Sequence, residues 1–155
     1  MEQIVRDVRI SQIYEGANGI QALDLVGRKL PKNMGRGITN FIKDSKSFLT
    51  NAYENGINPI VQPMTQAVDE LQQATEWLAA NGMKNPNDAG GASYDYMKMF
   101  GLVLLGLAHV RICMASDDSD RRNTATYFME RILPETRFLL ERIRQGSDTM
   151  MAAEF

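Results

Sequence analysis

The sequence has few of the residues that build disulfide or metal-bound frameworks. A single cysteine, Cys113, excludes an internal disulfide, and a single histidine, His109, leaves too few ligands for a zinc site. No basic stripe predicts binding to nucleic acid or to an anionic membrane, because the net charge is −2 and both signs are interspersed. We therefore expect a globular protein that folds through its hydrophobic core in a reducing, cytoplasmic compartment.

Long apolar runs are also absent. The most apolar stretch, Met99 to Val110, has 12 residues, whereas a membrane-spanning helix needs about 20. We interpret this stretch as a buried core helix and predict no membrane span. His109 and Cys113 lie near its end, four residues apart. Two ligands do not make a metal site, so we interpret His109 as a core histidine and predict no bound metal.

What the sequence does contain is helical periodicity from one end to the other. Apolar residues recur at spacings of three and four, and no segment alternates as a strand would. Turn residues such as Asn, Gly and Pro separate the periodic stretches. We predict the loop 84–91, a frayed tail over 146–155 and one kink within the last helix, at Pro134. The predicted helices are 2–12, 19–29, 38–55, 59–80, 93–116 and 121–145.

The predicted helices fall into two groups. The four long ones, from Ile38 onward, are joined by short connections, which is typical of an up-and-down bundle. The first two form a helix-turn-helix segment that precedes the bundle. We therefore predict an all-α fold with two parts, residues 1–30 and residues 31–155.

One turn carries a chemical signal. Glu15 ends the first predicted helix and directly precedes Gly16. A carboxylate held at a bend and shielded from water can act as a general base, and glycine lets a substrate approach the backbone closely. By itself this pattern is weak, because a glutamate in a connecting turn is usually only solvated.

The residues around this turn strengthen the interpretation. Residues 6–21 read RDVRISQIYEGANGIQ. This string resembles the C-terminal signature of acyl-CoA dehydrogenases, approximately R-D-x-R-I-x-x-I-Y-E-G-T-x-x-I-Q, and departs from it at one fixed position. The continuation to Leu30 is similar to a longer subgroup with an extra helical C-terminal domain, which includes the 3-methylmercaptopropionyl-CoA dehydrogenases.

The resemblance implies specific roles for the residues of the turn. Glu15 would be the base that removes the α-proton of an acyl-CoA thioester, and Gly16 would lie against that substrate. Ala17, Asn18 and Gly19 would contact FAD. Ala17 stands where the family usually has threonine, so the resemblance does not carry over the hydrogen bond that the threonine hydroxyl would make to the cofactor.

The resemblance also implies partners and missing parts. An electron-transfer flavoprotein would accept the electrons, and the protein would form a homo-oligomer. A complete enzyme of this family has further domains that hold most of the flavin and CoA, so we expect this chain alone to be inactive. We also expect Ile4, Val8 and Ile20 to be exposed. The alternative is a non-catalytic helical module for interaction or assembly, in which the Glu15 motif is a relic.

Overall fold

The computed structural model describes residues 2–13 and 16–153, and no strand occurs among them. Its elements, in chain order, are α1 (Glu2–Val8), the 3-10 helix η1 (Arg9–Gln12), α2 (Asn18–Asp24), the π-helix η2 (Leu25–Lys29), α3 (Arg36–Glu54), α4 (Asn58–Asn81), α5 (Pro86–Ala115), α6 (Ser119–Arg131), α7 (Glu135–Arg144) and α8 (Asp148–Met151).

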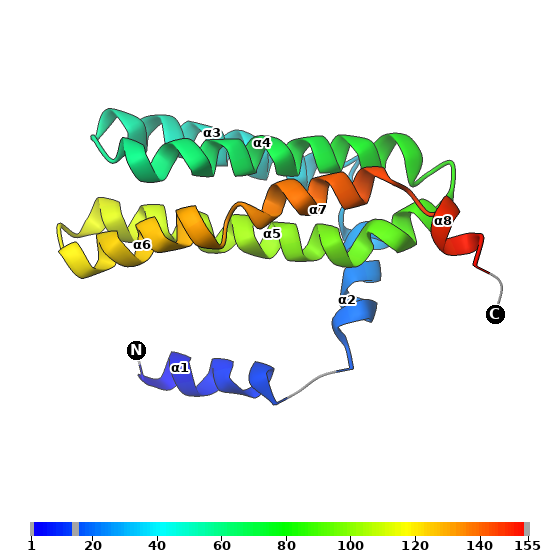
Figure 1. The fold of residues 1–155 in the computed structure, drawn as a ribbon, viewed down its shortest axis with the longest axis horizontal. Coiled ribbons are helices and arrows are strands. Elements are labelled where there is room, and N and C mark those ends of the chain that lie inside the picture. Colours follow the sequence, from blue (N-terminus) through cyan, green and yellow to red (C-terminus); the bar gives the residue numbers. More distant parts are fainter. Residues whose placement is uncertain (1, 14–15, 154–155) are drawn as a thin grey trace.

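Helices α3 to α7 form an antiparallel bundle. Figure 1 shows α3 and α4 side by side above α5, with α6 and α7 following one another along the length of α5. Helix α5 lies against α2, α3, α4, α6 and α7, so it is the central helix. The predicted all-α fold, a bundle preceded by shorter helices, is therefore confirmed.

The bundle core is built from the apolar stripes that the sequence predicts. Its largest fully buried side chains come from four helices, α3, α4, α5 and α7, and from the α6–α7 connection. They are Leu49, Val61, Met64, Val68, Leu71, Tyr96, Met99, Val103, Leu107, Leu133, Leu139 and Ile143.

The central helix is longer than the sequence predicts. Helix α5 begins at Pro86, so most of the predicted loop 84–91 is helical and that prediction is wrong. Proline is compatible with the first helical turn, because the N–H it lacks would have no intrahelical partner there. Asn85 caps the helix, since its side-chain oxygen accepts the backbone N–H of Asn87 at 3.1 Å.

Helix α5 is also long and apolar enough, by length and composition alone, to cross a membrane. The central helix of a bundle meets the same criterion. Its carboxylate Asp95 is buried and lies 3.0 Å from Arg142 of α7, a pairing that fits a helix packed among other helices.

A second correction concerns the segment around Pro134. The structure has two helices, α6 and α7, in place of the single kinked helix predicted over 121–145. Proline donates no backbone hydrogen bond and its ring clashes with the carbonyl of the preceding turn, so the helix ends at Arg131. The apolar stripe nevertheless continues through the break, because Leu133 is fully buried.

The C-terminal tail is tied down over part of its length. Residues 148–151 form the short helix α8, so the prediction of a frayed tail from 146 is wrong there. The Asp88 carboxylate accepts hydrogen bonds from the backbone N–H and the hydroxyl of Ser147, at 2.8 and 2.7 Å. These bonds hold the chain against the start of α5.

The first elements differ from the bundle in one respect. Helix α1 and the turn η1 bury none of their side chains. Figure 1 shows α1 standing away from the bundle, whereas α2 reaches α5.

Candidate functional site

The predicted catalytic turn lies between η1 and α2. Glu15, the predicted base, lies outside the described residues, as does Tyr14. Gly16 has φ +113°, a conformation that L side chains rarely adopt, so glycine is required at this position. Ala17 caps α2, and its carbonyl oxygen accepts the backbone N–H of Gln21 at 2.8 Å. The structure thus places Gly16 and Ala17 in a bend, and Asn18 and Gly19 in the first turn of α2 that follows it.

This bend is open to its surroundings. A Cβ atom added to Gly16 or to Gly19 would meet nothing within 4 Å. The apolar side chains on either side are exposed, Ile13 at 86% and Ile20 at 66%. A general base works best when it is shielded from water, and the described residues of the bend provide no such enclosure.

The exposed apolar surface continues along α1. Ile4 is 64% and Val8 is 61% exposed. Together with Ile20 these are the side chains that the sequence predicts to be uncovered, and that prediction is confirmed. Large exposed apolar side chains grouped along one segment are typical of contact regions between domains or subunits.

Three polar contacts inside the bundle were not predicted from the sequence. The Thr136 hydroxyl donates to the buried carboxylate of Glu70 at 2.5 Å. The hydroxyls of Thr75 and Tyr96 lie 2.8 Å apart, and burial raises the pKa of Tyr96 to about 12.

The third contact pairs Asp95 with Arg142. Burial raises the pKa of the Asp95 carboxyl, while the positive charges of Arg142 and Lys98 lower it. Each of the three contacts joins two helices across the bundle, so we interpret them as structural. Glu70 and Asp95 are acidic residues within apolar stripes, and that was the available signal for them.

The comparison with protein families concerns the bundle. A family model described as "Acetyl-CoA dehydrogenase C-terminal like" matches residues 36–154, most of the chain. The chain belongs to this family. The match begins at the first residue of α3 and includes every helix from α3 to α8.

An individual relative extends this finding to the first helices. The chain is 27% identical over 164 residues to a 3-methylmercaptopropionyl-CoA dehydrogenase of Ruegeria pomeroyi. The alignment covers 97% of this chain and 28% of that enzyme, so the chain spans little more than a quarter of the relative's length. The resemblance drawn from residues 6–30 is therefore confirmed at the level of the family. The division into parts 1–30 and 31–155 stays a prediction.

Members of the acyl-CoA dehydrogenase family generally carry FAD. The space beside Gly16 and Gly19 allows a flat group to approach the backbone. Ala17 has no hydroxyl, so its side chain offers no hydrogen bond to a cofactor there. The described residues leave room for one edge of a flat group, and contact of Ala17, Asn18 and Gly19 with FAD stays a prediction.

The histidine and cysteine of α5 serve packing. The His109 ring lies 4.8 Å from the Phe128 ring of α6, and burial lowers the pKa of His109. Cys113 is buried, which raises the pKa of its thiol. Over residues 2–13 and 16–153, no group of three or more His, Cys, Asp or Glu side chains is arranged to hold a metal ion.

Proposed function

We propose that this chain supplies the base-bearing turn and the C-terminal helical bundle of an FAD-dependent acyl-CoA dehydrogenase. The observation that carries the proposal is the string of residues 6–21, whose glutamate precedes a left-handed Gly16. The family match over 36–154 and the dehydrogenase relative support it independently.

The proposed chemistry places one step on this chain. The Glu15 carboxylate takes the proton from the α-carbon of an acyl-CoA thioester, and the electron pair of that C–H bond forms the α,β double bond. FAD, when bound, supplies the acceptor for the hydride that leaves the β-carbon. The backbone N–H of Glu15 polarises the thioester carbonyl, which stabilises the negative charge that develops on its oxygen.

Further parts of the enzyme complete the site in this proposal. The exposure of Ile13 and Ile20 supports a partner surface over the bend, because water would otherwise reach the base. An electron-transfer flavoprotein would reoxidise the flavin, and the enzyme would be a homo-oligomer. The substrate proposal stops at the class of acyl-CoA thioesters, because the relative shares 27% identity with this chain.

Replacing the base tests the proposal in the complete enzyme. Glu15→Gln keeps the size of the side chain and removes its basicity. We expect flavin content and acyl-CoA binding to be retained, while the rate of flavin reduction by substrate falls by orders of magnitude. Glu2→Gln, at an exposed acidic residue on α1, is the matched control. Normal flavin reduction in Glu15→Gln would show that another residue is the base.

The isolated chain offers a second test. We expect it to bind FAD weakly or not at all and to lack dehydrogenase activity, because the bend is open. Purification of the chain with one flavin per polypeptide would contradict this expectation.

A non-catalytic interaction module remains the second candidate. The observation that favours it is the self-contained bundle, whose core extends from Val26 to Ile143 without a residue of α1. The two candidates differ in their genomic context. A reading frame that continues upstream into a β-domain supports the enzyme, and a start codon at Met1 without such a partner supports the module.

A further inference from the structure

A second candidate binding site lies beside η2. The Glu15 bend precedes α2, so the two sites lie at opposite ends of the α2–η2 segment. A cavity of about 480 Å³ opens at the η2 end. It lies between η2, the turn 30–35, the C-terminal end of α4 and the N-terminal end of α5. Its walls are mainly apolar and include Val26, Leu30, Ile38 and Leu78. The size falls in the range of small-molecule pockets.

The backbone beside this cavity departs from regular geometry in two places. Helix η2 is a π-helix, in which the N–H of Leu30 donates to the carbonyl oxygen of Leu25 at 2.8 Å. Asn33, Met34 and Gly35 then follow one another in the left-handed region, with φ of 54°, 56° and 74°. Both features are found preferentially at functional sites, because the strain must be maintained by the surrounding fold.

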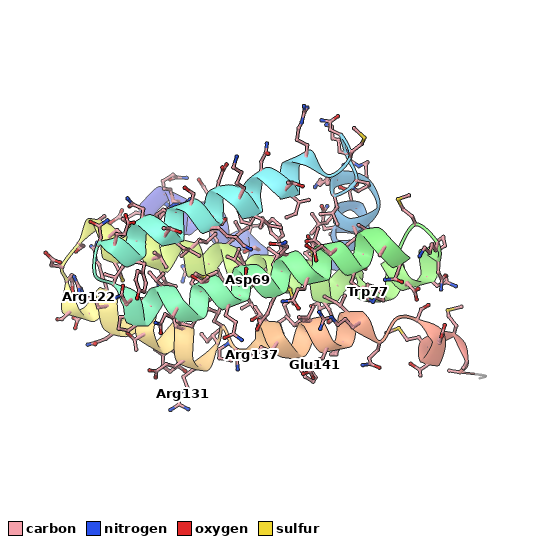
Figure 2. All side chains as sticks on the ribbon, turned by 90° about the horizontal axis from the view of Figure 1, so that it is seen from above. Asp69, Trp77, Arg122, Arg131, Arg137 and Glu141 are labelled. Carbon is pink, nitrogen blue, oxygen red and sulfur yellow. The ribbon has the colours of Figure 1, made fainter. Side chains whose placement is uncertain are left out.

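Two methionines stand at the mouth of the cavity. Both line it, yet Met34 is 100% and Met83 is 85% exposed. Methionine side chains are flexible and polarizable, so they can adapt to an apolar ligand that enters between them. Figure 2 shows α3 and α4 diverging toward the end of α4 that bears Trp77, which is the end where the cavity opens.

Three basic residues are immediate sequence neighbours of the residues that line the cavity. Lys32, Arg36 and Lys84 each follow a lining residue directly in the sequence, and all three are exposed. No ion pair with any of them occurs in the part of the chain that the structure describes. Of the acidic residues adjacent to lining positions, Asp88 holds Ser147 and Glu76 accepts a hydrogen bond from Gln72.

We propose that this cavity binds the apolar chain of a soluble single-chain carboxylate, whose anionic head lies among Lys32, Arg36 and Lys84. The apolar wall removes the chain from water, and the three cations favour a negative head over a neutral or positive one. The site does not depend on Glu15, so its test is independent of the proposed catalytic function.

Binding is measured by titrating the chain with decanoate below its micelle concentration, with labelled methionine methyl groups as reporters. We expect saturable shifts at Met34 and Met83, and none at the fully buried Met64 and Met99. Decanamide, which has the same chain and no charge, should bind more weakly, and added salt should weaken only the binding of decanoate.

Two variants with matched controls test the location. Ala79 lines the cavity from an exposed position on α4, so Ala79→Trp should fill it and abolish the shifts. Ala80→Trp, at the next exposed position outside the lining, should not.

The second variant tests the charge. The double variant Lys32→Gln, Lys84→Gln should weaken decanoate binding about threefold to tenfold. The double variant Arg9→Gln, Arg131→Gln removes two exposed cations elsewhere and should leave binding unchanged.

Four results would overturn the proposal. They are the absence of saturable shifts in the unmodified chain, shifts that persist in Ala79→Trp, equal affinity for decanamide, and binding to phosphatidylglycerol vesicles without binding to monomeric decanoate. The comparison of decanoate with decanamide needs no variant, so the proposal stays testable if Ala79→Trp does not fold.

Discussion

Helices α1 and α3 carry the same kind of sequence pattern and end in opposite environments. Ile4 and Val8 of α1 are more than 60% exposed, whereas Ile42 and Leu49 of α3 are at most 8% exposed. The spacing of three to four residues is sufficient to make one face of each helix apolar. What covers that face depends on neighbouring elements, which α3 finds in α4 and α5. An amphipathic pattern therefore predicts the helix without predicting its partner.

The largest expected effect is the difference in stability lost when a side chain is removed from the bundle and when one is removed from α1. Leu71→Ala empties a fully buried position on α4 and should lower the free energy of unfolding by about 2–5 kcal/mol. Ile4→Ala, at an exposed position on α1, should change it by less than about 0.5 kcal/mol. Urea unfolding followed by circular dichroism measures both. An equal loss in the two variants would mean that α1 is packed in solution.

A second prediction compares two glycines within the central helix. A Cβ at Gly106 would lie 2.3 Å from the sulfur of buried Met64, whereas one at Gly101 would meet nothing within 4 Å. Gly106→Ala should therefore cost about 1–2 kcal/mol, since crowding outweighs the gain in helix propensity. Gly101→Ala should stabilise the chain by up to about 1 kcal/mol. Thermal unfolding of both variants should shift in opposite directions, and a stabilised Gly106→Ala would refute close packing there.

A third prediction concerns the uncovered face of the first region. If Ile4 and Val8 mediate self-association, the double variant Ile4→Asp, Val8→Asp should raise the dissociation constant between copies at least about tenfold. Sedimentation velocity over a range of concentrations measures this. The double variant Asn40→Asp, Asn51→Asp adds the same charge at exposed positions on α3 and should have little effect. A chain that is monomeric before substitution would rule out this use of the face.

The smallest expected effect is a dependence of the bundle's stability on pH. Burial lowers the pKa of His109, the one histidine, below its usual value near 6.5. The unfolded chain then binds more protons in this range than the folded one, so stability should fall as the pH is lowered from about 7.5 to 6. In His109→Leu this decline should disappear. Urea unfolding at several pH values tests the point, and an unchanged decline in the variant would assign it to other groups.

Local sequence rules failed where two of them competed. Gly90 and Gly91 suggested a loop, yet the chain around them is helical because Pro86 and Asn85 start α5 earlier. Pro134 was interpreted as a kink, since the apolar stripe continued past it, and the backbone instead broke into α6 and α7. In both cases the apolar stripe was predicted correctly. Whether proline began or ended a helix depended on its position within the helical turn.

The candidate sites differ in how far they could be predicted. The bend at Gly16 is local, so a contiguous string of residues identifies it as a turn, and the structure adds the positive φ of Gly16. The cavity beside η2 is assembled from segments that are distant in the sequence, and it includes Val26, Leu78 and Ala89. No spacing rule connects such residues, because only the folded bundle brings them together.

The sequence by itself determined that this chain is helical, where the apolar faces lie and which carboxylate belongs to the family's catalytic string. These properties depend on neighbours a few residues apart, which share a turn of helix in any packing. The tertiary structure decided which faces are covered, where α5 begins, and that Val26, Leu78 and Ala89 line one cavity. Those outcomes depend on contacts between residues far apart in the sequence, whose energies no local pattern contains.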